Sequence, residues 1–310
     1  MKDILVIGFP GTDYQQIDYS GGELQVRLTP VTLEKVVSAE KIVINAMVRN
    51  AAELVALLLL NDALRAKSDA PRYLYIPYLP YARADRRFTD GDCHGLAFFL
   101  GMLRTGDFEE IRTLDVHNYK AVCRFSGEVT NIKPDKLIAA AALEFAVEHN
   151  DSTVNILFPD AGAAKRYKGS LPSYPNCRVL FAEKDRDPVT GKLLGFKVPD
   201  YSKFSGGAVL IVDDICDAGG TFLGIADAMR QDDRWKGYNG CAKLHLGLYV
   251  THGIFSKGFG GLGEYFGRIY TTNSFHSVTP GPKNLMRIFD AFEAIDAGEP
   301  QQFVIDSHAV

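Results

Sequence analysis

The strongest constraint on the fold of this chain is a regular alternation of short β-rich runs with helical segments. Aliphatic, β-branched and aromatic runs predict strands at 3–9, 41–48, 72–79, 111–117, 155–160, 178–184, 208–214, 243–252 and 268–273. The segments between them predict helices at 51–67, 94–104, 136–150 and 222–231. This alternation is typical of α/β proteins with largely parallel sheets flanked by helices.

The length of 310 residues is enough for two domains with their own cores. We expect the boundary near His149, where an alanine-rich helix gives way to the polar run "NDST" and a new strand. This divides the chain into domains of similar size, 1–149 and 150–310. A final helix is expected at 284–295 and is available to pack back on the first domain.

Composition excludes several classes of protein. No hydrophobic stretch is long enough to span a membrane and no basic-then-apolar leader follows Met1, so we expect a cytoplasmic protein that binds no membrane. The five cysteines lie far apart without paired spacing, which argues against a disulfide framework and a zinc site. A net charge of −4 disfavours nucleic-acid binding over the whole surface, so any anion site must be local.

Such a local site is predicted in "VLIVDDICDAGGTF", residues 209–222. Asp213 and Asp214 end a predicted strand, and ligands of open α/β sheets collect at the carboxyl ends of strands. Gly219 and Gly220 let backbone N–H groups converge before a helix, which is typical of a phosphate cradle. The carboxylates would repel a phosphate, so we expect them to face sugar hydroxyls or a divalent cation. The alternative is acidic capping of the following helix.

This segment resembles the phosphoribosyl-diphosphate binding motif that phosphoribosyltransferases share with ribose-phosphate pyrophosphokinases. Five further stretches occur in the order and spacing of the pyrophosphokinase family: "YSGGELQVRL", "PYLPYARADRRFTDGD", "TLDVHN", "FPDAGAAKRY" and "EKDRD". The likeness covers nearly the whole chain. It implies two phosphoribosyltransferase-like domains, with ATP and ribose 5-phosphate as substrates and Mg²⁺ as cofactor.

The reaction that the resemblance implies is transfer of a diphosphate from ATP to the anomeric hydroxyl of a phosphorylated ribose, with AMP leaving. Positioning and charge neutralisation carry most of such catalysis. Lys184 and Arg186 match the cations of the family's mobile catalytic loop. The alternative interpretation of "EKDRD" is a solvated charged turn.

The resemblance also implies roles for the remaining motifs. Asp213 and Asp214 match the groups that hold the ribose hydroxyls, while His117 and Asp160 match positions that hold magnesium bound to ATP. Since Mg²⁺ prefers oxygen ligands, Asp160 is the better ligand on chemistry, and His117 can equally be a scaffold residue. The segment expected to hold the 5-phosphate comprises Asp217, Ala218, Gly219, Gly220 and Thr221.

ATP recognition is expected from two parts of the first domain. Arg83 and Arg86 match the family's ATP-binding arginines, and guanidinium groups can stack on adenine or pair with phosphates. Tyr19 and Glu23 match an adenine-stacking aromatic and a base-recognising carboxylate. In the family these two residues reach a neighbouring subunit's ATP site, so a homo-oligomer, from dimer to hexamer, is implied.

Two departures from the family pattern leave the substrates open. Gly21 stands where the family carries an aspartate near adenine, which puts nucleotide selectivity in doubt. Ala218 stands where the family carries a threonine, and so removes one hydroxyl donor to the 5-phosphate. Ribose 5-phosphate is the default acceptor. A phosphodiester has one charge fewer and a bulky substituent, so ADP-ribose, whose product would feed NAD formation, is the alternative acceptor.

Two other functions compete with this interpretation. A phosphoribosyltransferase needs only the cradle, and leaves "YARADRR" and the N-terminal half unexplained. A non-catalytic regulatory relative is expected to lose Lys184 or Arg186, and both are present. The run "GFGGLG" at 258–263 matches a dinucleotide fingerprint literally, but no strand leads into it, so we expect a glycine-rich loop.

Overall fold

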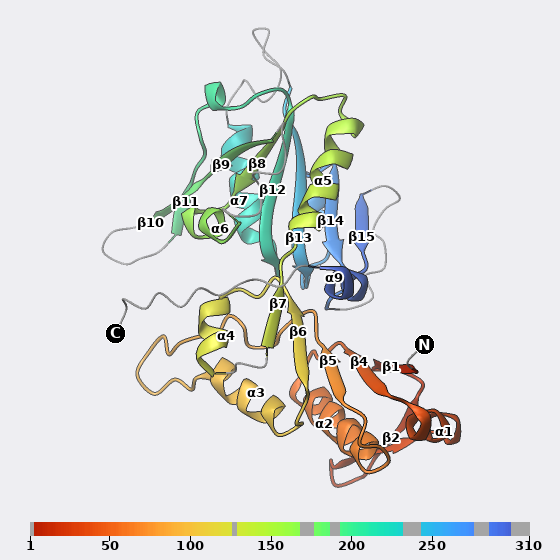
Figure 1. Cartoon of the computed structure of the whole chain (residues 1–310). Coiled ribbons are helices and arrows are strands. Elements are labelled where there is room, and N and C mark those ends of the chain that lie inside the picture. Colours follow the sequence, from red (N-terminus) through yellow and green to blue (C-terminus); the bar gives the residue numbers. More distant parts are fainter. Residues whose placement is uncertain are drawn as a thin grey trace, which may run out of the picture. The chain divides into compact units, whose positions relative to one another are not determined.

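The computed structural model describes residues 3–125, 129–167, 177–186, 193–231, 243–275 and 285–298. They belong to two compact units, one made of 1–133 with 291–310 and the other of 134–290. Each is a largely parallel sheet flanked by helices, which confirms the predicted α/β class (Figure 1). Across the described residues, no helix is both long and apolar enough to cross a bilayer.

Unit 1 is built on a five-stranded parallel sheet in the order β1-β4-β5-β6-β7. Its strands are β1 (Ile4–Phe9), β4 (Lys41–Ala46), β5 (Arg72–Tyr75), β6 (Glu110–Leu114) and β7 (Val129–Ile132). An antiparallel hairpin joins β2 (Tyr14–Asp18) to β3 (Leu24–Leu28). The helices are α1 (Pro30–Ser38), α2 (Ala51–Arg65), α3 (Gly95–Arg104), α4 (Tyr119–Phe125) and α9 (Ala291–Ala297).

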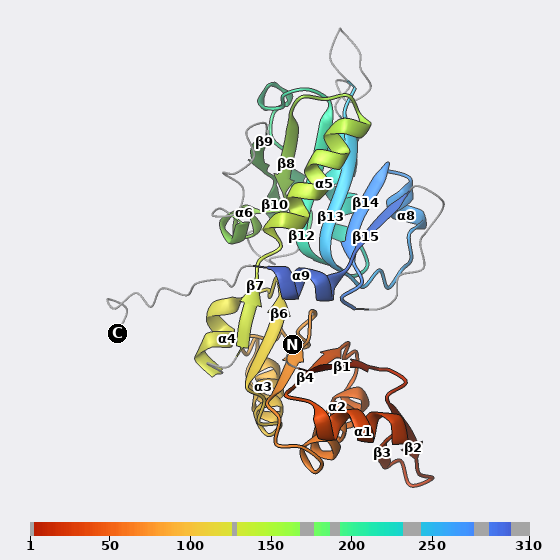
Figure 2. The same ribbon diagram turned by 45° about the vertical axis from the view of Figure 1, so that its right-hand side comes forward.

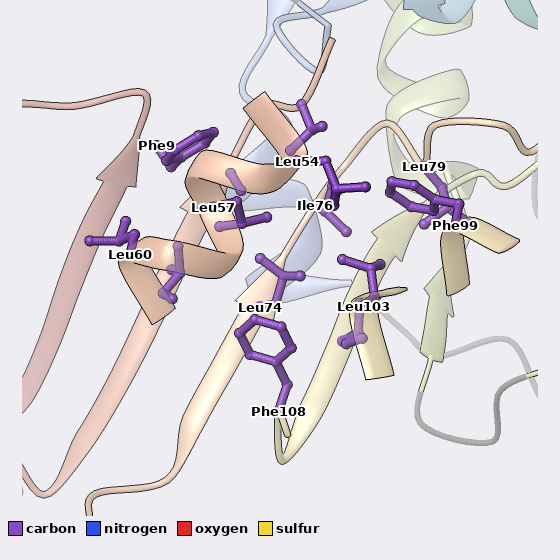
Figure 3. Packing of buried hydrophobic residues seen from close by; sticks show 14 of the residues in the cluster. Phe9, Leu54, Leu57, Leu60, Leu74, Ile76, Leu79, Phe99, Leu103 and Phe108 are labelled. Atoms are coloured by element: carbon purple, nitrogen blue, oxygen red, sulfur yellow. The ribbon is translucent and has the colours of Figure 1, made fainter. Parts of the chain in front are cut away.

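Helix α2 illustrates how the sequence builds the core of unit 1. Asn50 caps its first turn by accepting the backbone N–H of Glu53 at 3.0 Å. Leu54, Leu57 and Leu60 follow at helical spacing and are buried together (Figure 3). Replacing one of these leucines by alanine typically costs about 2–5 kcal/mol, so this face anchors the helix to the sheet.

Unit 2 is built on a six-stranded sheet in the order β15-β14-β13-β12-β8-β9, with every pair parallel. Its strands are β8 (Val154–Phe158), β9 (Cys177–Phe181), β12 (Ala208–Cys216), β13 (His245–Gly253), β14 (Arg268–Thr272) and β15 (Met286–Phe289). A separate antiparallel pair joins β10 (Glu183–Arg186) to β11 (Leu193–Lys197). The helices are α5 (Asp135–Glu148), α6 (Ala161–Tyr167), α7 (Gly220–Arg230), α8 (Gly260–Gly263) and a short 3₁₀ turn at Tyr201–Lys203.

Strand β12 is buried on both faces because its aliphatic run is unbroken. Val209 and Ile211 join the apolar cluster that includes α7, whereas Leu210 and Val212 join the one that includes α5. Figure 2 shows α5 lying along one face of the sheet. This packing fixes the carboxyl end of β12, where the two aspartates stand.

The two units divide ahead of α5, not near His149. The buried Ile138, Ala142 and Phe145 of α5 share an apolar cluster with β8 and β12, so this helix belongs to unit 2. An alanine-rich helix carries little directional pattern, which is why the sequence placed it with the preceding segment. Helix α9 is part of unit 1 and lies against β6.

Three expected elements differ in the structure. The predicted helix at 284–295 is strand β15 over Met286–Phe289, because these residues pair with β14, and is helical only in α9. The predicted strand at 178–184 divides at Ala182 into β9 and β10, which join different sheets. The "GFGGLG" segment contains the short helix α8 and is not simply a loop.

Candidate active site

The carboxyl end of β12 places two carboxylates in a nearly closed environment. The side chains of Asp213 and Asp214 are 19% and 4% exposed. The backbone N–H of Asp214 donates to Oδ1 of Asp213 at 2.9 Å. Burial, followed by the charge of Asp214, raises the pKa of Asp213 well above its usual range. Ionisation of both carboxyl groups is therefore unfavourable unless a cation lies beside them.

Arg166 supplies that cation from α6, which follows the neighbouring strand β8. Its Nη1 atom lies 2.7 Å from Oδ1 of Asp214 and 3.7 Å from Oδ1 of Asp213. Our sequence reasoning missed this residue, although it stands inside "FPDAGAAKRY". The available signal was its place in a short helix that begins where β8 ends, since β8 pairs with β12.

The turn after β12 has the backbone geometry expected of an anion cradle. Gly219 caps α7 in a left-handed conformation with φ of 82°, and a β-carbon there would lie 3.1 Å from Leu262 Cδ2. A β-carbon on Gly220 would meet nothing within 4 Å, so the space above this residue is open. The first N–H groups of α7, including that of Thr221, point out of the helix end. Ala218 is exposed beside them.

Leu262 belongs to the glycine-rich segment, which therefore packs against the cradle. Helix α8 contacts α7. The backbone N–H of Ser256 also donates to the carbonyl of Asp217 at 3.2 Å. The segment that resembled a dinucleotide fingerprint thus supports the turn after β12.

Lys184 and Asp160 form an ion pair in unit 2. The Nζ of Lys184 lies 2.7 Å from Oδ2 of Asp160, while Oδ1 of Asp160 accepts the N–H of Ala163 at 2.9 Å. Burial opposes ionisation of Asp160, but the hydrogen bonds from Lys184 and Ala163 outweigh it and lower its pKa. Arg186 lies on the same strand, β10, and its side chain is outside the part that the structure describes.

In unit 1, the arginine motif lies beside the loop that carries His117. Arg83 and Arg86 are exposed, and the guanidinium of Arg86 lies 5.2 Å from the ring centroid of Phe88. Asn118 Nδ2 donates to Oδ2 of Asp85 at 2.5 Å, which ties the two loops together. Arg87 is engaged within the motif, because its Nε donates to the carbonyl of Asp92 at 3.0 Å.

Tyr19 and Glu23 flank the turn of the β2–β3 hairpin. The N–H of Tyr19 donates to the carbonyl of Glu23 at 2.8 Å, and Gly22 has a φ of 91°. Tyr19 is 53% exposed. The hairpin lies beyond the β1 edge of the sheet, whereas α4 and β6 lie at the other side (Figure 1). Within unit 1, the hairpin therefore stands apart from the loop that precedes α3 and carries the arginine motif (Figure 1).

The two expected metal residues fall in different units, His117 in unit 1 and Asp160 in unit 2. Among the described residues, no three His, Cys, Asp or Glu side chains gather as a metal cluster. Asp160 nevertheless suits Mg²⁺, because Oδ2 is a carboxylate oxygen on a partly exposed side chain. Mg²⁺ is commonly held by one or two carboxylates together with substrate phosphates.

Known proteins resemble this chain in sequence and in fold. No family model matches the chain. A ribose-phosphate pyrophosphokinase of Pyrococcus furiosus is 31% identical over 250 residues, which cover 80% of this chain and 81% of the relative. This chain belongs to the ribose-phosphate pyrophosphokinase family. Another pyrophosphokinase, from Thermococcus kodakarensis, is 30% identical over 213 residues, covering 66% of this chain and 67% of the relative.

A solved structure extends the likeness to the fold. The crystal structure of phosphoribosylpyrophosphate synthetase from Mycobacterium smegmatis matches with a TM-score of 0.74. It covers 95% of this chain and 97% of its own, at 20% identity. The family predicted from the motifs is thus confirmed. In this member of the ribose-phosphate pyrophosphokinase family, Lys184, Asp160 and Asp214 are held in ion pairs.

Proposed function

We propose that this chain is a Mg²⁺-dependent diphosphokinase that transfers the β,γ-diphosphate of ATP to the C1 hydroxyl of a 5-phosphorylated ribose and releases AMP. One observation carries the proposal: a buried carboxylate pair lies near the carboxyl end of β12, and an open glycine turn follows this strand. The first suits hydroxyl groups and the second suits a phosphate, so together they fit a sugar phosphate. Family membership supports this reaction class.

The acceptor occupies unit 2 in this proposal. Asp213 and Asp214 accept hydrogen bonds from the ribose hydroxyls, which then replace part of the compensation that Arg166 provides. The 5-phosphate lies in the open space above Gly220, where the N-terminal N–H groups of α7 and the Thr221 hydroxyl can donate to it.

Lys184 and Arg186 stabilise the negative charge on the transferring diphosphate. Lys184 donates one N–H to Asp160, and the other N–H groups of its ammonium can donate to phosphate oxygens during the reaction. Preorganised cations of this kind typically contribute factors of about 10²–10³ in rate. Attack by the C1 oxygen on the β-phosphorus breaks the bond to the α-phosphate oxygen, and AMP takes that electron pair.

Asp160 and His117 would hold Mg²⁺, which supplies charge neutralisation on the ATP phosphates. Asp160 would offer Mg²⁺ its Oδ2 atom, which also accepts an N–H of Lys184 at 2.7 Å. Its Oδ1 atom remains bonded to Ala163 and keeps the carboxylate oriented.

ATP is recognised by Arg83 and Arg86 from one subunit and by Tyr19 and Glu23 from a neighbour. This division is supported by the separation of the hairpin from the arginine motif within unit 1. A homo-oligomer of at least two copies follows from it. Gly21 leaves space beside the Glu23 carboxylate, since a β-carbon there would lie 3.6 Å from Oε2.

Ribose 5-phosphate is the default acceptor, and ADP-ribose is the alternative that one observation favours. Ala218 presents an exposed methyl group at the cradle in place of a hydroxyl donor. A hydrogen bond to a charged group is worth about 1.5–3 kcal/mol, so a dianionic monoester loses more here than a phosphodiester.

The experiment is a paired assay of AMP release with each acceptor under the same ATP and Mg²⁺, on the wild type and on A218T. We expect one acceptor to dominate, because sites that leave polar groups unpaired discriminate strongly. Activity on ribose 5-phosphate alone, with higher activity in A218T, would exclude ADP-ribose as the acceptor. Activity on ADP-ribose alone would exclude ribose 5-phosphate as the acceptor. Absence of AMP with both, but release of diphosphate from a phosphoribosyl diphosphate, would instead indicate a phosphoribosyltransferase.

A further inference from the structure

A second group of basic side chains surrounds a pocket in unit 2, away from the candidate active site. The pocket has a volume of about 260 Å³ and its lining includes His149, Arg230, Lys243, His245 and Tyr265. His245 begins β13 and pairs with Ala208, five residues before Asp213 on β12. Since strands rise roughly 3.3 Å per residue, the pocket lies about 17 Å from the carboxylate pair, at the amino edge of the sheet.

The described lining contains four basic side chains and no carboxylate. The rings of His149 and His245 stack with centroids 4.3 Å apart and planes 18° apart. Burial, followed by the charges of His149 and Lys243, lowers the pKa of His245, and Asp151 acts in the opposite direction. Basic side chains therefore lie close together at this pocket, although the net charge of the chain is −4.

Two carboxylates of the described residues near the pocket are engaged in other contacts. Asp151 Oδ2 accepts the backbone N–H groups of Gly207 and Ala208, at 2.6 and 2.9 Å. Asp227 accepts the hydroxyl of Tyr265. The guanidinium of Arg230 lies 3.7 Å from the Tyr265 ring centroid, which holds this cation at the pocket.

We propose that this pocket binds a small phosphate-bearing anion at a site separate from the proposed active site. Arg230 and Lys243 supply permanent positive charge and N–H donors, and the two imidazoles add donors when protonated. A bound dianion offsets the positive charge beside His245, so protonation of this ring and binding of the anion favour each other. The proposal does not depend on the reaction at β12.

The test follows the ring resonances of His149 and His245 by NMR, assigned with H149Q and H245Q, while inorganic phosphate is added at constant ionic strength. We expect saturable shifts of both rings and a rise in the pKa of His245 when phosphate is bound. K243Q and R230Q should each weaken phosphate binding at least fivefold. K35Q, which alters an exposed lysine on α1 of unit 1, should leave it unchanged.

Three outcomes would overturn the proposal. Shifts that are equal with chloride, or that do not saturate, would indicate screening and not a site. An unchanged affinity in both K243Q and R230Q would show that these cations serve only the C-terminal ends of α5 and α7. Phosphate that shifts the backbone signals of Gly219 and Gly220 but leaves both rings unmoved would place the only phosphate site at the β12 turn.

Discussion

The Nζ of Lys184 lies 2.7 Å from Oδ2 of Asp160, so the proposed catalytic cation and the proposed metal ligand form one ion pair. Because both side chains are partly exposed, such a pair contributes little to stability, about 0–1 kcal/mol. The contact therefore adds little to the stability of unit 2, and in the proposed mechanism it positions Lys184.

Replacing Lys184 with alanine should lower kcat by about 10²-fold or more, because a cation that stabilises the transferring phosphates is lost. The melting temperature should stay near that of the wild type. Steady-state AMP release and circular dichroism measure the two effects, with K203A as the control for an exposed lysine of the same unit. Near-normal turnover in K184A would remove this residue from the mechanism.

Asp213→Asn should stabilise the protein at neutral pH, by about 1 kcal/mol, because the folded state no longer buries a charge beside Asp214. The pKa of Asp213 is raised on folding, so between about pH 4 and this raised value the folded state binds more protons than the unfolded state. Stability of the wild type therefore falls as pH rises through this window.

Melting curves of the wild type and D213N from pH 4 to pH 8 test the direction of this pH dependence. The two should converge near pH 4 and separate as pH rises, with D213N the more stable. A wild type that is more stable than D213N at pH 7.5 would contradict the raised pKa. D213N should also lose activity, since the amide replaces a hydroxyl-binding carboxylate.

Arg166→Gln should destabilise unit 2 by about 2 kcal/mol, because it leaves the buried Asp214 without its cation. Adding D214N to R166Q should recover part of the loss, since no uncompensated charge then remains. Urea denaturation measures both variants, with K165Q, an exposed neighbour on α6, as the control. Equal stability of R166Q and R166Q/D214N would show that the ion pair is not the cause.

Much of this architecture could be predicted from sequence because buried parallel strands are continuous aliphatic runs. The runs at 208–214 and 243–252 correspond to β12 and β13. The segment 286–289 was misassigned because its pairing with β14, the preceding element of the chain, makes it a strand. Its local pattern fits a helix equally well.

The sequence predicts those parts of the candidate site whose residues lie within one short motif. It does not predict those parts that depend on contacts between separate elements. The carboxylates and glycines of 213–221 lie within one short segment, so their chemistry can be read together. Arg166 was missed because its role depends on α6 facing the end of β12. Likewise, the ion pair of Lys184 with Asp160 joins residues of β10 and the β8–α6 turn.

Complementation tests the proposed sharing of the ATP site between subunits. Y19A/E23A and K184A should each have little activity alone, because one lacks adenine contacts and the other a catalytic cation. Mixed after reversible dissociation, they should regain activity, since some sites receive intact residues from both copies. No recovery on mixing, or a fully active wild-type monomer in light scattering, would show that each site is complete within one chain.

The most direct test of the central claim is to identify by ³¹P NMR the products formed from ATP and the preferred acceptor with Mg²⁺. Attack at the β-phosphorus predicts equal amounts of AMP and of an acceptor carrying a diphosphate at C1, with no turnover when the acceptor is omitted. Formation of ADP with a singly phosphorylated acceptor, or AMP release without any acceptor, would contradict diphosphate transfer by this protein.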